Sequence, residues 1–535
     1  MAKLQTSTKL TSLMTKVAFT APHYLASECG ASILHAGGTA VDAMVAAAAM
    51  VAVQYPHMNS LGGDGFWLIQ EKGKPPVAID ACGTAASGVC LDEYRQLCGE
   101  KITVRGGRAA LTMAGTVSGW KLAREHSEKS YPSMPLDELF APAIRACTVG
   151  VDQTDSLRLA LAKCEAEFSS SPDFDVYRQL FGNLEKYQKL KNPALATLFS
   201  DLAEQGLDAF YRGDIASKLA QGLARYESPL TLSDFHNFEA SFVEPLQVTI
   251  SKGELFNLPA PSQGLASLLI LAIFDRLYQP DLSEAEAVHA LVEATKQAFI
   301  VRDREVVDPT RLSQRWSGLL DDASVQALAA KVDMSSALPW PRPSEAGDTV
   351  WMGAVDRFGT MVSFIQSIYW EFGSGCVIPE YGLIWNNRGT SFSLDAEHVN
   401  VLAPGMKPFH TLNPALANFR DGSRMVYGTM GGEGQPQTQA AIIYRSIYRD
   451  LNLSQAIDSP RWLLGRTWGD ESHDLKMESS LYEEISQELE SKGHELNEVA
   501  GFNELMGHAG AIRIDGDGDI EAASDHRSDG AAIVI

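Results

Sequence analysis

Thr349 stands where a proline-rich segment without hydrophobic period, residues 332–348, gives way to a strand-like one. Gly347, just upstream, allows backbone conformations closed to other residues. A threonine hydroxyl at such a junction can attack the preceding carbonyl, so that the chain is cut between Asp348 and Thr349. The new α-amine titrates near neutral pH and can act as general base for the hydroxyl of its own residue. The pattern is compatible with a self-cleaving hydrolase whose nucleophile is Thr349, but taken alone it is more typical of a threonine that begins an ordinary strand.

A second group of residues could stabilise a negatively charged intermediate. Gly431 and Gly432 follow a predicted strand in the stretch YGTMGG. Paired glycines can turn successive N–H groups toward one point, where an oxyanion develops. Taken alone, such a pair after a strand is usually a simple turn.

The elements that must position these residues change in character along the chain. Helices are predicted over residues 24–35 and 41–54, followed by the run GGDG, whose glycines permit close backbone approach in a tight turn before a strand. Residues 100–330 are expected to be largely helical. We interpret residues 332–348 as the clearest linker.

After the linker, strand patterns dominate. Hairpins are predicted for residues 350–355 with 360–368, for 414–419 with 424–428, and around 515–518, and an amphipathic helix for 480–492. Strands and helices in separate runs favour an α+β layered sandwich.

Composition narrows the function classes. The 535 residues are 45% hydrophobic and 21% charged, with a formal net charge of -23. Such an acidic chain repels phosphate backbones, so we expect no nucleic-acid partner. The seven cysteines are odd in number and form no CxxC pair, which is typical of reduced thiols. With no apolar run of signal-peptide or membrane-spanning length, we expect a cytoplasmic protein with no membrane contact.

Eight motifs, taken in order, resemble the γ-glutamyltransferase family. They are PHYLASECGASILHAGGTAVDAMVAAA, PHMNSLGGDGF, AGTVSGW, LPAPSQG, GDT, FGSG, NNR and MGG, and they extend from about residue 20 to the C-terminus. The resemblance implies an N-terminal-nucleophile hydrolase with a four-layer αββα sandwich. It also implies cleavage into fragments 1–348 and 349–535, which associate as one compact unit. Whether two such units form a dimer is left open.

The resemblance also assigns roles to single residues. Thr349 is implied to be the nucleophile, and Gly431 and Gly432 the oxyanion hole. Ser367 stands where the family has a second threonine that hydrogen-bonds the nucleophile. The role of Glu433, next to these glycines, is left open between positioning water and capping a helix.

This chain departs from the family where relatives bind a γ-glutamyl group. Cys82 replaces an arginine that holds the α-carboxylate, while Arg388 and Ser391 replace the glutamine and aspartate that hold the α-ammonium. His410 and Thr411 replace a serine pair. Tyr369 stands where many relatives have asparagine.

These changes reverse the charge that the site should prefer. A site that loses an ammonium-binding carboxylate and gains an arginine should repel an ammonium and attract a carboxylate. We therefore expect Arg388 to anchor a substrate carboxylate, with His410, Thr411 and Tyr369 as further substrate contacts. A structural ion pair for Arg388 and a core position for His410 are the plain alternatives.

The stretches MGGEGQPQTQA, SPRWLLGRTWG and PFHTLNPA look like the oxamate amidohydrolase branch of the family. The expected reaction is hydrolysis of a small carboxylate-bearing amide, best represented by oxamate, to oxalate and ammonia, in nitrogen scavenging downstream of purine and ureide breakdown. The alternatives are a γ-glutamyl hydrolase or transpeptidase, a side-chain acylase, and an unprocessed binding protein without catalysis.

No pattern predicts a metal or another cofactor. Asp515, Asp517 and Asp519 have the spacing of a calcium loop, but Ile520 and His526 stand where that loop needs glycine and glutamate. A hairpin turn is the better interpretation.

Overall fold

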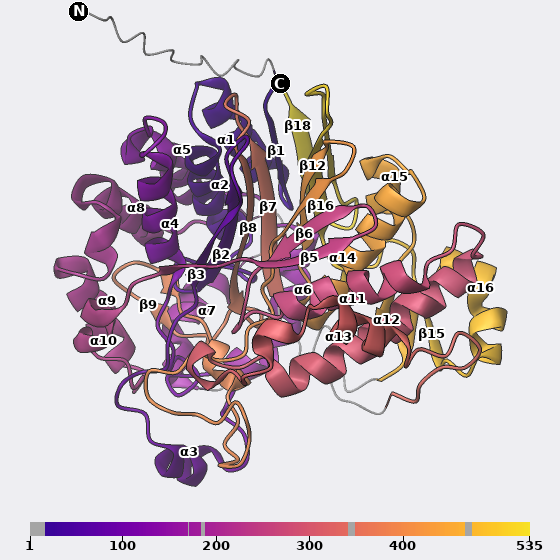
Figure 1. Ribbon diagram of the computed structural model, residues 1–535. Helices are drawn as coiled ribbons and strands as arrows, with labels where there is room; N and C mark the ends of the chain where they lie inside the picture. The colour runs from indigo at the N-terminus through magenta and orange to yellow at the C-terminus, as the bar shows by residue number, and fades with distance from the viewer. Residues whose placement is uncertain (1–15, 170, 183, 185–187, 341–347, 466–472) are drawn as a thin grey trace, which may run out of the picture.

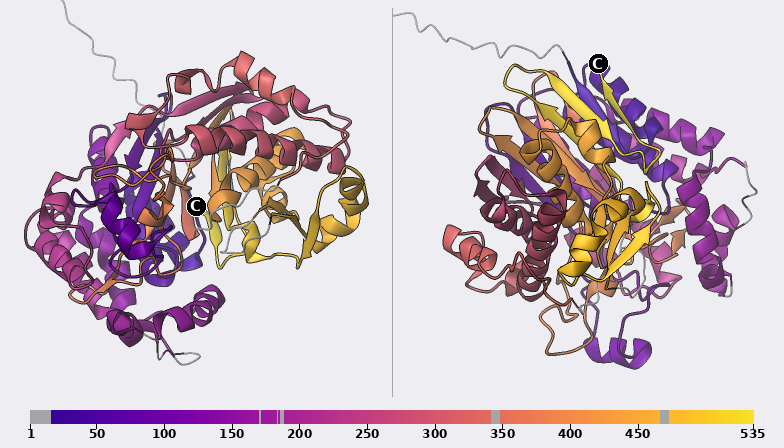
Figure 2. Two further views of the ribbon diagram at one scale, coloured as in Figure 1. Left: turned by 90° about the horizontal axis from the view of Figure 1, so that it is seen from below. Right: turned by 90° about the vertical axis from the view of Figure 1, so that its right-hand side faces the viewer.

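The structure, a computed structural model, describes residues 16–169, 171–182, 184, 188–340, 348–465 and 473–535. Two β-sheets lie face to face and helices cover the outer face of each (Figures 1 and 2). The expected four-layer αββα sandwich is confirmed. Residues 341–347 of the predicted linker, with Gly347, and residues 466–469 of the SPRWLLGRTWG stretch lie outside the described residues.

The first sheet has seven antiparallel strands in the order β18-β1-β7-β8-β2-β3-β4. The strands span Ala531–Val534 (β18), Ala18–Ala21 (β1), Asp348–Val355 (β7), Met361–Tyr369 (β8), Asp64–Gln70 (β2), Val77–Ala81 (β3) and Ser241–Val243 (β4). The strands β7 and β8 therefore lie between β1 and β2, which come from before Thr349. A cut before Thr349 would leave both fragments joined by β-ladder hydrogen bonds.

The second sheet has six antiparallel strands in the order β17-β16-β12-β11-β6-β5. They span Ile520–Ser524 (β17), Ala509–Ile514 (β16), Arg424–Thr429 (β12), Ala415–Phe419 (β11), Gly253–Asn257 (β6) and Leu246–Ile250 (β5). The three predicted hairpins correspond to β7 with β8, β11 with β12, and β16 with β17. Asp515 Oδ1 accepts the N–H groups of Asp517 and Asp519 at 3.0 and 2.8 Å, which makes that acidic stretch a hairpin turn.

Helices of the N-terminal part cover the outer face of the first sheet (Figure 1). They include α1 (Tyr24–His35), α2 (Ala40–Gln54), α4 (Thr116–Ser127), α5 (Leu136–Val149) and α8 (Pro193–Gln205). The apolar helix α2 lies directly on β7 and β8. Its one charged residue, Asp42, forms a capping box with Thr39 and accepts a hydrogen bond from Arg124 at 2.8 Å, so that the buried charge is paired.

The second sheet is covered by α11 (Gly264–Leu277), α12 (Glu284–Glu305), α14 (Gln435–Ile443) and, further out, α16 (Ser479–Ser491). The remaining helices are α3 (Leu91–Cys98), α6 (Asp155–Phe168), α7 (Asp175–Phe181), α9 (Asp214–Ala224), α10 (Leu232–Asn237), α13 (Asp322–Ala329) and α15 (Leu453–Asp458). Smaller sheets are formed by β9 (Val377–Ile378) with β10 (Leu383–Ile384), and by β13 (Trp462–Leu464), β14 (Leu475–Glu478) and β15 (Leu496–Val499).

The expectation that residues 100–330 are largely helical missed three strands, β4, β5 and β6. Each has five residues or fewer, which is too short for a hydrophobic period to be distinguished from a helical turn. β4 pairs with β3 and β6 with β11, which are distant in the sequence, whereas β5 pairs with β6 in a hairpin. No helix within the described residues is both long and apolar enough to cross a membrane.

Trp351 of β7 fills the space between the two sheets. It is 2% exposed, and its indole N–H donates to Ser363 Oγ at 2.9 Å. Gly428 of β12 and Gly510 of β16 leave room for this ring, because a Cβ atom at either position would lie 2.3 or 2.5 Å from it. The first sheet, which contains Thr349, thus packs against the second sheet through the Trp351 indole and the glycines that make room for it.

We expect Gly428→Ala to lower the stability of the protein by about 1–3 kcal/mol, because the added methyl group overpacks the space that Trp351 occupies. Thermal unfolding should show a lower Tm. Gly88→Ala is the matched control, since a Cβ there meets nothing within 4 Å. Equal Tm values for the two variants would contradict this account of the sheet interface.

Candidate active site

Three polar side chains form a row at one end of neighbouring strands in the first sheet. Thr349 lies at the start of β7, Ser367 near the end of β8 and Asp64 at the start of β2, and all three are at most 2% exposed. Asp64 and Ser367 are direct cross-strand partners. Because side chains alternate along a strand, the row shares the face whose next residues, Trp351, Ile365 and Phe66, enter the core between the sheets. The row therefore faces the second sheet.

The predicted cleavage site lies at an irregularity of the ladder. Asp348 pairs with Tyr369 and Val350 pairs with Gln366, so one residue of β7 stands opposite two of β8. Irregularities of this kind re-aim a side chain and interrupt regular pairing. Tyr369 itself has a positive φ of 84°, an uncommon conformation for a bulky residue. Thr349 is thus held in a strand but outside its regular register.

The glycine pair follows β12 and forms a left-handed turn. Gly431 has φ 113° and Gly432 has φ 52°, and the short helix from Gly432 to Gly434 leads directly into α14. Within the described part of the chain, neither glycine N–H donates to a protein acceptor. Two N–H groups at the positive end of a helix are suited to an oxyanion.

An amide network joins this turn to Thr349. Gln435 Nε2 donates to Thr349 Oγ1 at 3.4 Å, and Gln435 Oε1 accepts a hydrogen bond from Asn413 Nδ2 at 3.0 Å. Gln263 Nε2 donates to the carbonyl groups of Gly432 and Thr411 at 2.8 and 2.7 Å. The nucleophile, the glycine turn and the segment around Thr411 are therefore parts of one buried framework.

Arg388 is 1% exposed and contacts this framework at Thr411. Its guanidinium group donates to Ser391 Oγ at 3.3 Å and to Thr411 Oγ1 at 3.1 Å. The guanidinium carbon lies 3.6 Å from the centre of the Tyr369 ring, in a cation–π contact. Because Tyr369 pairs with Asp348, the cation is near the start of β7.

His410 lies among these residues, but its ring is already engaged. Nε2 is 3.0 Å from Asp64 Oδ2, and Nδ1 accepts the Leu412 N–H at 3.3 Å. Burial, followed by the Arg388 and Lys407 charges, holds the pKa of His410 well below its usual value, so the ring is neutral. This geometry gives His410 a role in fixing Asp64, and direct contact with a substrate stays a prediction.

Asp64 was not singled out as a site residue from the sequence. Burial raises the pKa of its carboxyl group to about 7, and the opposing influences are led by the Gly83 N–H and the Arg388 charge. Oδ1 accepts N–H groups of Gly83 and Gly115 at 2.8 and 3.3 Å. The GGDG run gave the only sequence signal, and its glycines have a packing role. A Cβ at Gly62 or Gly63 would lie 2.1 Å from a backbone oxygen of another segment.

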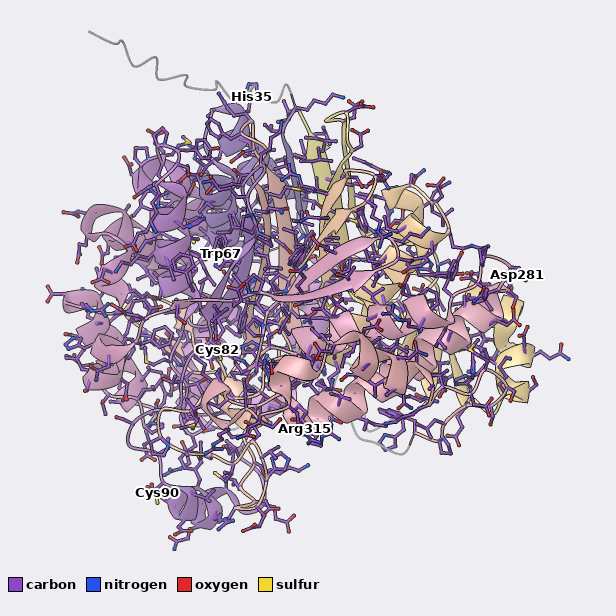
Figure 3. All side chains as sticks on the ribbon, viewed as in Figure 1. His35, Trp67, Cys82, Cys90, Asp281 and Arg315 are labelled. Atoms are coloured by element: carbon purple, nitrogen blue, oxygen red, sulfur yellow. The ribbon has the colours of Figure 1, made fainter. Side chains whose placement is uncertain are left out.

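Cys82, expected from the resemblance to stand in place of an arginine, is a buried thiol below Trp67 in the view of Figure 3. Burial raises its pKa well above the usual value. Cys82, Asp64 and His410 place potential metal ligands within 4.8 Å of one another. The His410 nitrogen facing Asp64 carries a proton, since the other accepts the Leu412 N–H, and Arg388 adds a positive charge. This group is therefore poorly suited to a cation.

A second group of potential ligands is formed by His289 and Glu293 of α12 and by His494, which follows α16. His289 Nδ1 and His494 Nε2 are 2.8 Å apart, and Lys296 Nζ donates to Glu293 Oε1 at 2.7 Å. The lysine charge opposes a metal there as well. The role of Glu433 was left open by the sequence. It forms a buried ion pair of 2.8 Å with Arg302 of α12, and this pair links the glycine turn to that helix.

Comparison with known proteins agrees with the motifs. The gamma-glutamyltranspeptidase family model matches residues 26–535. The oxamate amidohydrolase proenzyme of Klebsiella pneumoniae is 48% identical over 515 residues, which covers 96% of this chain and 97% of that protein. The glutathione hydrolase-like YwrD proenzyme of Bacillus subtilis is 35% identical, with 97% of this chain and 99% of that protein covered.

Among solved structures, a cephalosporin acylase from Bacillus halodurans superposes with a TM-score of 0.88 at 27% identity, covering 97% of this chain and 96% of the acylase. The family resemblance seen in the motifs is thereby confirmed. The chain belongs to the gamma-glutamyltranspeptidase family and is an amidohydrolase of the N-terminal-nucleophile type, made as a self-processing proenzyme.

Proposed function

We propose that the chain cuts itself before Thr349 and that the freed Thr349 hydrolyses a small amide bearing a carboxylate, with oxamate as the first candidate. The substrate class is inferred from the buried guanidinium group of Arg388, which contacts two hydroxyl groups and the Tyr369 ring. The name of the Klebsiella relative supports oxamate within that class.

In the first stage, Thr349 Oγ attacks the carbonyl carbon of Asp348. The peptide C–N bond breaks, the nitrogen takes a proton to become the α-amine of Thr349, and an ester joins Asp348 to Oγ. Water then hydrolyses this ester and releases fragment 1–348. The ladder irregularity at Thr349 supports this step, because it takes the hydroxyl out of regular register.

In the second stage, Thr349 Oγ attacks the amide carbon of the substrate while its proton passes to the α-amine. The N–H groups of Gly431 and Gly432 stabilise the oxyanion. The amide nitrogen takes the proton and leaves as ammonia. Water then hydrolyses the acyl ester, so that oxamate gives oxalate. Ser367, beside Thr349 on β8, is proposed to support the nucleophile.

The charge of the site determines which amide is accepted. A buried guanidinium strongly favours a carboxylate, whose two oxygens match its fork, and disfavours the ammonium of a γ-glutamyl group. Thr411 Oγ1 and Ser391 Oγ turn the guanidinium group and can contact the same carboxylate. His410 is proposed to act through Asp64.

An acylase acting on a larger amide is the second candidate, favoured by the likeness to the cephalosporin acylase. A γ-glutamyl hydrolase or transpeptidase is less compatible, since Cys82 and Arg388 stand in place of its substrate anchors. Ammonia release from oxamate, measured beside hydrolysis of an acyl side-chain amide and of a γ-glutamyl anilide, separates the three activities.

Thr349→Ala should abolish both cleavage and hydrolysis, because the attacking oxygen is lost. Intact mass spectrometry of the freshly purified parent protein should show two fragments, the smaller beginning at Thr349, and the variant should remain a single chain. Incubation of the cleaved parent with oxamate should release ammonia. A variant cut at the same bond would show that Thr349 is not the nucleophile.

Arg388→Ala should still cut itself but lose about 30-fold to several thousand-fold in kcat/KM for oxamate, since a buried charge-assisted contact is worth roughly 2–5 kcal/mol. Arg388→Lys keeps the charge and loses the fork, so an intermediate value is expected. Oxamate hydrolysis at the parent rate by the alanine variant would remove Arg388 from substrate binding.

The two stages should differ in their pH dependence. Hydrolysis uses the free α-amine as base, so kcat/KM should rise with pH through the range near ~7.7–8.0 where such an amine loses its proton. Self-cleavage occurs before that amine exists and should lack this rise. Rates of fragment formation and of ammonia release, measured over the same buffers, test the difference.

A further inference from the structure

Gln435 is the polar side chain that lies against the reacting oxygen of Thr349 from the second sheet. It is fully buried at the first position of α14, directly after the glycine turn. No role for it follows from the charge argument that identified Arg388. We propose that Gln435 is a catalytic residue that donates a hydrogen bond to Thr349 Oγ during both self-cleavage and hydrolysis. This inference rests on Thr349 being the nucleophile.

The orientation of the Gln435 amide follows from its neighbours. The carbonyl oxygen of Thr411 can only accept, and Asn413 lies 3.0 Å from it, so the Asn413 atom facing it is the amino nitrogen, Nδ2. The same nitrogen lies 3.0 Å from the Gln435 amide, which must therefore present its oxygen there. The Gln435 amino group is left to face Thr349 Oγ1 at 3.4 Å.

The environment of Asn413 holds this orientation. The backbone carbonyl oxygen of Asn413 accepts a hydrogen bond from Gln439 Nε2 at 2.6 Å. The side-chain oxygen of Asn413, Oδ1, lies 3.4 Å from Asn257 Nδ2. Asn257, Asn413 and Gln439 have no solvent exposure. A rotated Gln435 amide would place its amino nitrogen against Asn413 Nδ2, so that two donors would face each other in a buried site, which is costly.

A donor at this position assists each step in which Oγ carries charge. When the hydroxyl attacks, its O–H bond breaks and its proton passes to the scissile nitrogen in self-cleavage or to the α-amine in hydrolysis, while the Gln435 N–H stabilises the partial negative charge on Oγ. When water hydrolyses the ester, the C–Oγ bond breaks and Oγ leaves with developing charge before it is reprotonated. The same contact acts again, without any other reactant.

The donor also directs the hydroxyl hydrogen of Thr349. Because Oγ1 accepts from Gln435, its own hydrogen points to another partner, and after cleavage the α-amine of the same residue is within reach. Gln435 thus differs from Arg388. Arg388 is expected to affect substrate binding alone, whereas Gln435 should affect both reactions of Thr349 and leave binding unchanged.

The test compares Gln435→Leu and the isosteric Gln435→Glu with Gln437→Leu. Gln437 lies on the same helix, is also buried, and bonds both backbone groups of Leu464, so its loss removes hydrogen bonds without touching Thr349. We expect both Gln435 variants to slow fragment formation and to lower kcat on oxamate by about ten- to a hundred-fold, with KM nearly unchanged. Gln437→Leu should retain the parent rates.

Asn413→Asp provides a test in which Gln435 itself is retained. A carboxylate at position 413 can only accept, so it should attract the Gln435 amino group and turn the amide oxygen toward Thr349. Fragment formation and kcat should fall as in Gln435→Glu. The time course of fragment masses and the split between kcat and KM are the measurements, with thermal unfolding to confirm that each variant is folded.

Two results would overturn the inference without affecting the proposed function. One is a Gln435→Leu chain that cuts itself and turns over oxamate at parent rates while Thr349→Ala stays intact. The other is a loss confined to KM. Cleavage of Thr349→Ala at the same bond would instead remove the nucleophile and the inference together.

Discussion

The hydrogen-bonded position of β7 between β1 and β8 is the constraint on which the site depends. Thr349 is the second residue of this strand, so the proposed nucleophile lies in the body of a sheet. Ser367 and Asp64 are aligned with it by neighbouring strands, and Trp351 seats the same strand on the second sheet. The glycine turn and Gln435 belong to that second sheet and its helix. Packing of the sheets therefore sets the distance between nucleophile and oxyanion donors.

The order of strands in the first sheet also bears on self-processing. β7 and β8 come from after the proposed cut, whereas β1 and β2 on either side of them come from before it. Breaking one peptide bond leaves both ladders intact. The product can thus remain a single folded unit, in which β7 stays paired with β1 of the large fragment.

Local patterns were sufficient to predict much of this arrangement. The helices at residues 24–35 and 41–54, the three hairpins and the glycine turn depend on neighbouring residues, and their positions agree with α1, α2 and the paired strands. Features built from distant contacts were missed. Asp64 meets His410 across 346 positions and Gln435 meets Thr349 across 86, and no periodicity in one sequence can reveal such contacts.

His410 shows that the residue type alone does not determine the role of a side chain. Its residue type suggested a hydrogen-bond donor for a substrate, but its role depends on which atoms its ring meets, and these come from Asp64 and Leu412. The charge reversal expected at Arg388 concerns residue type alone and stays a prediction. The way in which Tyr369 and Thr411 hold that cation depends on the fold.

The pairing of Asp348 with Tyr369 connects cleavage to substrate access. In the continuous chain, the backbone before Thr349 is held beside Tyr369, whose ring lies against Arg388. Under the proposed cleavage, Asp348 becomes a chain end and its single pairing at the strand terminus no longer has a covalent neighbour to hold it. Release of that end would free the new α-amine at the start of β7, beside the Tyr369 ring that contacts Arg388. One bond-breaking event would then create the base next to the proposed place of a substrate carboxylate, so that an uncut chain lacks the base.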